Sequence, residues 1–302
     1  MCLWRRRPAH PISLAIMSLR NLLHRLSGGR LPPPPPTVAV LRLDGVIATR
    51  GGVRGKSLSM AGLAEPIERA FAVKDLAAVA LVINSPGGSP VQSALIERRI
   101  RHLATEKNVP VLAFVEDVAA SGGYWLALAA DEIWAQDASI LGSIGVVSAG
   151  FGFTDLIRRF GIERRVHTAG TSKAMLDPFR AEDPDDVARL QALQLDIHDG
   201  FKDLVRARRG ARLKEDDEIF TGAIFTGRQA LARGLIDGIG DLRQVLRERF
   251  GTRVRLRPIA GRPRRGFGLR RLGFASRFDP LDLVTDGLSA LEERAIWARF
   301  GL

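Results

Sequence analysis

Cysteine is nearly absent from this sequence, which contains Cys2 as the only one among 302 residues. A single cysteine excludes an internal disulfide framework. The sequence also has no cluster of cysteines and histidines at metal-ligand spacing and no P-loop pattern that would hold phosphates. We therefore expect no metal ion and no nucleotide or other cofactor.

Long hydrophobic runs are missing as well, since no stretch reaches the ~18 consecutive apolar residues of a membrane-spanning helix. The nearest candidate runs from Pro11 to Leu23 and is closed by Arg20 and His24. Its apolar part is short for a secretory signal, and no small-residue cleavage site follows it. Apolar residues recur at helical spacing from Ile12 to Leu26, which favours a basic amphipathic helix on a membrane surface. We expect peripheral membrane association, on the cytoplasmic side.

Acidic residues are absent from the first 36 positions, which hold six arginines and a run of five prolines. Residues 251–302 hold eleven arginines and five acidic residues, whereas residues 37–250 hold 28 of each sign. The net charge of +12 therefore belongs to the two ends. This distribution predicts a basic head with a proline-rich spacer (1–36), a neutral globular core (37–250) and a basic amphipathic tail (251–302).

Basic ends favour an anionic surface, and the alternative is that they are only solvated. The arginine-rich ends lack interleaved aromatic residues and any nucleic-acid-binding module, so we expect no nucleic-acid partner. If the basic ends bind a partner, we expect it to be an anionic membrane surface.

The most informative stretch runs from Val118 to Asp131 and contains Ser121-Gly122-Gly123. The apolar run Val109 to Val115, closed by Glu116-Asp117, predicts a buried strand, and good helix formers follow from Tyr124 to Ala130. The serine therefore stands where a strand turns into a helix, beside backbone N–H groups that lack partners and favour an oxyanion. The residues alone leave two interpretations: the serine is a nucleophile, or it only caps the helix.

A second stretch has the same form, because the apolar strand Ala78 to Asn84 runs into the turn Pro86-Gly87-Gly88. The glycines supply another set of free N–H groups at a second strand end. Ligands of α/β folds bind at the carboxyl ends of neighbouring strands. We therefore expect the two loops to meet at one site.

Strands and helices alternate from residue 37 to residue 135, which predicts a parallel sheet with right-handed crossover connections. The helix predicted at Val91 to Lys107 places Leu95 inside and Glu97 in solvent. Further elements are listed by their residues: a first strand at Thr37–Ala48, a short strand at Glu132–Ala135, a strand at Glu163–Thr168, a long helix at Asp183–Arg209 and a last core helix at Asp241–Phe250.

Four segments in this order resemble the S49 peptidase family, in its signal peptide peptidase A group. They are Ile83–Ser89 (INSPGGS), Ala119–Ala127 (AASGGYWLA), Ser139–Val146 and Ala169–Phe179. The resemblance covers roughly residues 37 to 250, and the core occurs once, as in the single-core members of the family. It implies the ClpP/crotonase superfold, an α/β fold whose parallel sheet is flanked by helices and built from βα and ββα units.

A serine nucleophile needs a base, and among the histidines only His167 merits consideration, near the end of a predicted strand. A lysine in an apolar context, such as Lys173 beside Ala174-Met175-Leu176, is the recorded alternative. The resemblance implies Ser121 as nucleophile and Lys173 as general base. It also implies that Ser143 orients the lysine amine, and that the N–H groups of Gly122 and of Gly87 or Gly88 hold the oxyanion.

In the resembled family, single-core chains assemble so that the serine and the lysine of one site come from neighbouring subunits. The resemblance therefore implies a homo-oligomer with shared active sites. Its substrates would be peptides, namely signal-peptide remnants or other membrane-associated peptides, docked as extended strands.

Two other interpretations stay open. A crotonase-like acyl-CoA enzyme also uses two backbone N–H groups at strand ends, with Glu116 or Asp117 as acid or base. A catalytically silent scaffold on a membrane surface would keep the fold without the chemistry, although such a protein would need neither Ser121 nor Lys173.

Overall fold

The computed structural model describes residues 34–49, 57–259 and 294–301. Within these ranges eight strands form one sheet in the order β6-β5-β3-β2-β1-β8, with β4 beside β3 and β7 beside β4. The strands are β1 (Thr37–Asp44), β2 (Leu76–Ser85), β3 (Val111–Ala120), β4 (Glu132–Ala135), β5 (Ile140–Gly142), β6 (Ile224–Thr226), β7 (Gly238–Ile239) and β8 (Arg255–Pro258). Only the β5–β6 pair is antiparallel among them. The expected α/β class with a mostly parallel sheet is confirmed.

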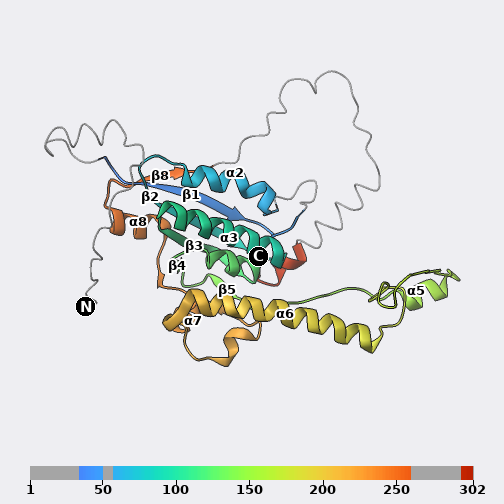
Figure 1. Ribbon diagram of the computed structural model, residues 1–302. Helices are drawn as coiled ribbons and strands as arrows, with labels where there is room; N and C mark the ends of the chain where they lie inside the picture. The colour runs from blue at the N-terminus through green and yellow to red at the C-terminus, as the bar shows by residue number, and fades with distance from the viewer. Residues whose placement is uncertain (1–33, 50–56, 260–293, 302) are drawn as a thin grey trace, which may run out of the picture.

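Helices cover both faces of the sheet (Figure 1). The α-helices along the described chain are α2 (Met60–Phe71), α3 (Pro90–Lys107), α4 (Gly122–Ala127), α5 (Thr154–Arg159), α6 (Pro184–Arg209), α7 (Gly227–Ala232) and α8 (Leu242–Phe250). Residues of α2, α3 and α4 pack in one core cluster with one face of the central strands, and residues of α8 pack against the other face. The predicted amphipathic helix of the basic head lies outside the described residues, as do residues 50–56.

The central strands are buried on both sides, which explains why their sequences are continuous apolar runs. In β2, Val79, Leu81 and Ile83 pack towards α2 and α3, while Ala78 and Ala80 pack towards α8. The small alanines leave room for the side chains of that helix. The loops after β2 and β3 leave the sheet at neighbouring positions, because these strands pair from Val79 and Val111 to Ser85 and Ala119, with one shift of register after Ile83.

The structure differs from three of these expectations. Strand β3 does not end before Glu116-Asp117 but continues to Ala120, because its last three residues pair with β5. Residues 163–168 form no strand, since they lie in a segment with no neighbouring strand to pair with. The sheet also extends past the expected core boundary at residue 250, because β8 pairs with β1.

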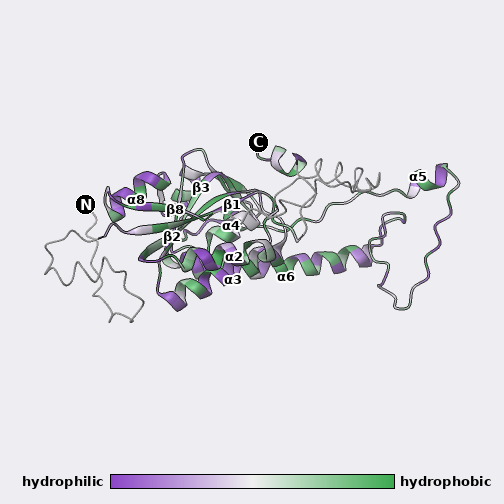
Figure 2. Cartoon of the chain, turned by 90° about the horizontal axis from the view of Figure 1, so that it is seen from above, coloured by the Kyte–Doolittle hydropathy of each residue, from purple (hydrophilic) through white to green (hydrophobic). Residues whose placement is uncertain are grey.

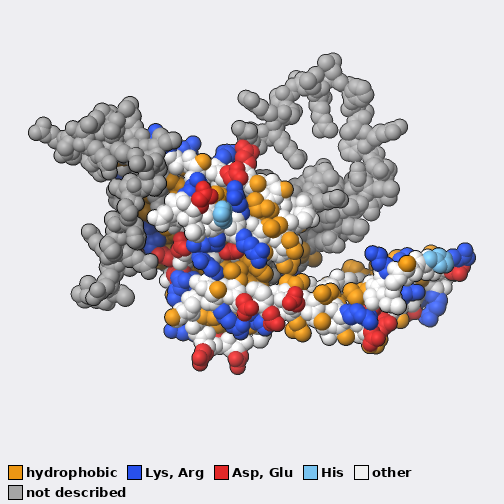
Figure 3. Space-filling model, in the orientation of Figure 1, with side chains coloured by type: hydrophobic (Ala, Val, Ile, Leu, Met, Phe, Trp, Pro, Cys, Tyr) orange, Lys and Arg blue, Asp and Glu red, His pale blue; other side chains and the backbone are white. Residues whose placement is uncertain are grey.

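An arm, defined here as residues 147–195, projects from the body of the molecule (Figures 1 and 2). It contains α5, the irregular segment that carries Lys173, and the outer half of α6. No residue of α6 before Phe201 is buried, whereas Phe201, Val205 and Arg209 fix its inner half to the body. Figure 3 shows hydrophobic side chains on the exposed surface of this arm.

Candidate active site

Ser121 occupies the junction between β3 and α4 in a backbone conformation that L-residues rarely adopt, with φ 52° and ψ −120°. Its N–H donates to the carbonyl oxygen of Gly142 over 2.8 Å, and its own carbonyl accepts from the N–H of Trp125 over 3.0 Å. The Ser121 side chain makes no capping bond to α4. The structure thus places the serine at the predicted strand-to-helix turn and excludes the interpretation in which its hydroxyl caps the helix.

Helix α4 is itself held in place by buried polar contacts. The hydroxyl of Tyr124 donates to the carbonyl oxygen of Leu235 over 2.7 Å. Nearby, the buried Arg209 donates to both carboxylate oxygens of Asp237 over 2.8 and 3.1 Å. Burial by itself raises the pKa of Asp237, but the hydrogen bonds and positive charge of Arg209 outweigh it and hold that pKa below its ordinary value. The strained serine therefore stands on a firmly anchored helix.

The loop after β2 packs directly against this junction. A Cβ on Gly87 would stand 2.8 Å from the nitrogen of Gly122 and 2.9 Å from Cβ of Ser121. Gly88 has φ 137°, and a Cβ there would stand 2.1 Å from the carbonyl oxygen of Ile47. Only glycine fits at both positions. The two loops expected to meet at one site do meet.

The N–H groups around Ser121 differ in availability. The N–H of Gly87 donates to Oγ of Ser85 over 3.2 Å, so it is already engaged. Gly122 is the first residue of α4, and its N–H has no acceptor within the helix. Gly88 and Gly122, rather than Gly87, therefore keep the N–H groups that suit an oxyanion.

A pocket of about 580 Å³ opens beside Ser121 and also contains Ser143. Ser143 has φ 50°, and its N–H donates to the carbonyl oxygen of Ala223 over 2.7 Å. The lining residues are Pro86, Gly88, Ser89, Pro90, Ser121, Ser143, Gly145, Val146, Val147, Thr221, Gly222, Ile296, Arg299 and Phe300. The structure therefore brings Ser121, Ser143 and Gly88 together in one cavity.

The last described segment, residues 294–301, contributes Ile296, Arg299 and Phe300 to this pocket. The sequence predicted these residues to belong to a tail outside the core. Their apolar spacing indicated an amphipathic element but could not indicate which surface it covers.

Lys173 is not brought to Ser121 within one chain. It is exposed and does not line the Ser121 pocket. The segment between α5 and α6, to which it belongs, lies on the arm and away from α4 (Figure 2). Asp177, the nearest acidic residue in sequence, is paired with Arg164 over 2.9 Å, and this hydrogen bond lowers the pKa of the Asp177 carboxyl. His167, the other candidate base, is also exposed on the arm.

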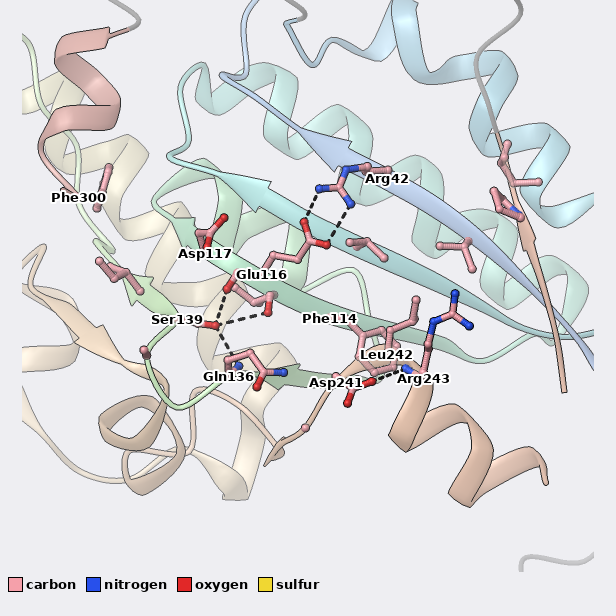
Figure 4. Close-up of a pocket in the computed structure, with 18 residues that line it drawn as sticks. Arg42, Phe114, Glu116, Asp117, Gln136, Ser139, Asp241, Leu242, Arg243 and Phe300 are labelled. Atoms are coloured by element: carbon pink, nitrogen blue, oxygen red, sulfur yellow. Dashed lines mark hydrogen bonds and ion pairs between the residues drawn. The ribbon is translucent and has the colours of Figure 1, made fainter. Parts of the chain in front are cut away.

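A second cavity, of about 940 Å³, lies on the sheet face that α8 partly covers (Figure 4). Glu116 and Asp117 line this cavity and not the Ser121 pocket. The Glu116 carboxylate is held by the guanidinium of Arg42, with one of its two bonds at 3.0 Å. The acyl-CoA interpretation therefore loses its acid/base candidates, because neither carboxylate lies beside the pair of free N–H groups.

In the described part of the chain, no three histidine, cysteine or acidic side chains are arranged to hold a metal ion. No helix there is both long enough and apolar enough to cross a membrane.

Comparisons with known proteins by family model and by sequence agree on one family. Residues 104–250 match the family model of peptidase family S49. The chain is 32% identical over 225 residues to the chloroplastic serine protease SPPA of Arabidopsis thaliana, a match that covers 73% of this chain and 32% of that protein. A solved structure of a membrane-bound stomatin-specific protease mutant aligns with 75% of this chain and 99% of its own, at 15% identity and a TM-score of 0.47.

A protein of Brucella abortus (strain 2308) is more similar, at 50% identity over 293 residues, and bears the name Na(+)/H(+) antiporter NhaA. The match covers 94% of this chain but 40% of that protein, so most of the protein that carries the antiporter name lies outside it. The chain spans less than half the length of either curated relative.

Proposed function

The chain belongs to peptidase family S49, a family of serine-type peptidases, and we propose that it hydrolyses peptide bonds with a Ser-Lys dyad, Ser121 and Lys173. One observation carries this proposal. Ser121 stands in a strained turn with its hydroxyl free of a capping bond, in a pocket that also holds Ser143 and Gly88. Strained conformations of this kind cluster at functional sites.

The chemistry follows from these groups. The neutral amine of Lys173 removes the proton from Oγ of Ser121 as that oxygen attacks the peptide carbonyl carbon. The oxyanion accepts hydrogen bonds from the N–H groups of Gly88 and Gly122. The lysine ammonium then protonates the leaving amine. Water, deprotonated by the same lysine, hydrolyses the acyl-enzyme and regenerates Ser121, while Ser143 orients the lysine amine.

The position of Lys173 on the arm supports a site shared between copies of the chain. A lysine at the end of a projecting arm is out of reach of its own serine but available to a neighbour. Eight of the thirteen exposed large hydrophobic side chains in the described residues lie on residues 147–195, Phe151 and Phe160 among them. An arm with so much apolar surface favours an oligomer in which it is covered.

The pocket also bears on the substrate. Gly145, Val146 and Val147 form an irregular segment along its wall, whose backbone is suited to pairing with an extended peptide. Small apolar substrate side chains fit this lining, which supports signal-peptide remnants or other membrane-associated peptides as substrates. Binding to an anionic membrane through the basic ends, on its cytoplasmic side, is part of the proposal and is testable by sedimentation with anionic vesicles.

Two single variants test the dyad. In hydrolysis of a quenched apolar peptide, Ser121→Ala and Lys173→Ala are each expected to lose activity by about a thousandfold or more, with folding and assembly intact. Lys74→Ala, an exposed lysine of the body, serves as the control and should stay active. Activity that survives Ser121→Ala would remove the peptidase assignment of this site.

A further inference from the structure

Two residues of helix α6, three positions apart, contact the segments that carry Ser143 and Ser121. Nε2 of His198 lies 2.9 Å from the carbonyl oxygen of Ile144, the residue after Ser143. The ring of Phe201 stacks on Trp125 of α4, with centroids 4.5 Å apart and planes inclined by 22°. One turn of α6 thus reaches both the Ser143 loop and the helix that follows Ser121.

The chemistry of the His198 contact is fixed by its partner. A carbonyl oxygen only accepts, so Nε2 must carry a hydrogen and donate it. This holds in the neutral ring with the proton on Nε2 and in the protonated ring alike. His198 therefore donates this hydrogen bond through Nε2 whether the ring is neutral or protonated. Its Nε2 is not available to remove a proton from another group.

The loop that receives this bond needs support. Ser143 is held in the left-handed region, at φ 50°. The backbone bonds of the loop are Ser143 N–H to Ala223 and Gly145 N–H to the Ser143 carbonyl, at 2.7 and 2.9 Å. A strained residue persists only where its surroundings over-determine it. His198 adds a side-chain bond to the middle of the loop, from a helix whose inner half is buried at Phe201, Val205 and Arg209.

We propose that His198 is a positioning residue, which fixes the Ser143 loop so that the Ser143 hydroxyl meets the incoming lysine amine. The inference rests on the proposed function, because it assigns a role within the same site. His198 does not touch the reacting atoms; it acts through the Ile144 carbonyl.

Two substitutions at one position test this role. His198→Leu removes the donor, while His198→Gln offers an amide N–H at a similar distance from the helix. For a quenched apolar peptide, His198→Leu is expected to lower kcat about tenfold with KM changed less than about twofold, and His198→Gln is expected to recover most of kcat. His102→Leu on the exposed surface of α3 is the matched control and should leave both constants unchanged.

A second readout does not depend on the peptide chosen. The rate at which a fluorophosphonate labels Ser121 should fall in His198→Leu and recover in His198→Gln. The variants and the wild type are compared at the same oligomeric state. Wild-type kcat in His198→Leu would overturn the inference. Equal losses in the leucine and glutamine variants would do the same, since the donor would then be irrelevant. Failure of the proposed function itself looks different: wild type and Ser121→Ala would hydrolyse the peptide equally.

Discussion

At the scale of single residues, the site depends on backbone conformations that most residues avoid. Ser121 and Ser143 both have positive φ, and Gly88 has φ 137°. Strain of this kind costs about 1–3 kcal/mol per residue and has to be offset by surrounding contacts. The N–H groups of Ser121 and Ser143 donate to the carbonyl oxygens of Gly142 and Ala223, and these bonds supply such contacts. The N–H of Trp125 adds a bond to the carbonyl oxygen of Ser121. The geometry of the proposed nucleophile is therefore determined by its neighbours as much as by the serine itself.

Gly88 provides a direct test of this dependence. Gly88→Ala is expected to destabilise the chain by about 2 kcal/mol or more and to abolish peptide hydrolysis, because its Cβ would meet the Ile47 carbonyl at 2.1 Å. Gly150→Ala is the control, since nothing lies within 4 Å of a Cβ there. Urea unfolding and the peptide assay measure the two effects. Wild-type stability and activity in Gly88→Ala would show that the loop is not confined as described.

The Arg209–Asp237 pair predicts a dependence of stability on pH. Asp237→Asn is expected to cost about 3–5 kcal/mol at pH 7, because it leaves Arg209 buried without its carboxylate. The pKa of Asp237 is lower in the folded chain than in the unfolded one, so its stabilisation is fully present above the unfolded value. It is lost as the pH falls through the folded pKa.

Unfolding in urea at pH 7 and at about pH 3 therefore distinguishes this pair from a surface pair. The difference between wild type and Asp237→Asn should shrink at the lower pH. Asp137→Asn, which removes an exposed ion pair with Arg228, should change little at either pH. A cost for Asp237→Asn that is the same at both pH values would contradict the account.

At the scale of secondary-structure elements, the sequence predicts an element correctly where signals within that element are enough to determine it. The strand Glu132–Ala135 and the long helix predicted over Asp183–Arg209 are confirmed. The helix runs over Pro184–Arg209, and Asp183 caps it. Both rest on local signals, namely a short apolar strand pattern and acidic residues before a long periodic run. The loops beside Ser121 and Gly88 were predictable for the same reason, because each follows a buried strand.

The prediction fails where contacts with a distant part of the chain determine which side chains are buried. Leu95 was expected inside and Glu97 in solvent, yet Leu95 is 42% exposed and Glu97 is 6% exposed. Burial raises the pKa of Glu97, and the positive charges of Arg208 and Arg101 oppose that rise. Arg208 comes from α6, more than a hundred residues away, so no local pattern of α3 reveals it. The same holds for Lys173, whose distance from Ser121 is set by the direction of the arm.

The C-terminal segment gives a prediction at this scale. Ile296 and Phe300 line the Ser121 pocket, so replacing both with alanine should widen it and speed fluorophosphonate labelling of Ser121 by a few fold. Arg294→Ala, on the exposed side of the same segment, should label at the wild-type rate. Slower labelling in the double variant would mean that the segment supports the pocket instead of narrowing it.

At the scale of the whole molecule, one chain holds all the parts of the proposed site without assembling them. Ser121, Ser143 and Gly88 share a pocket in the body, and Lys173 stands on the arm. Apolar side chains on the arm, such as Phe151 at 81% and Phe160 at 73% exposure, have no cover within the described chain. Both features have one explanation if the arm docks on another copy.

This explanation predicts that the arm matters for assembly and not for folding. Phe160→Asp should leave the melting temperature of the chain nearly unchanged, because the side chain is already exposed, while abolishing oligomers and activity together. Leu231→Asp, which changes an exposed leucine of the body on α7, is the matched control and should keep both. Sedimentation velocity and the peptide assay measure the outcome. An oligomeric, active Phe160→Asp would place the interface elsewhere.

The most direct test of the shared site is to combine the two inactive variants in one assembly. Ser121→Ala and Lys173→Ala chains with different affinity tags are co-expressed and purified through both tags. Each mixed site can unite an intact serine from one chain with an intact lysine from the other. The account predicts recovery of roughly a quarter of wild-type activity for random one-to-one mixing in a closed ring. Doubly tagged assemblies that stay inactive, beside doubly tagged wild type that is active, would contradict it.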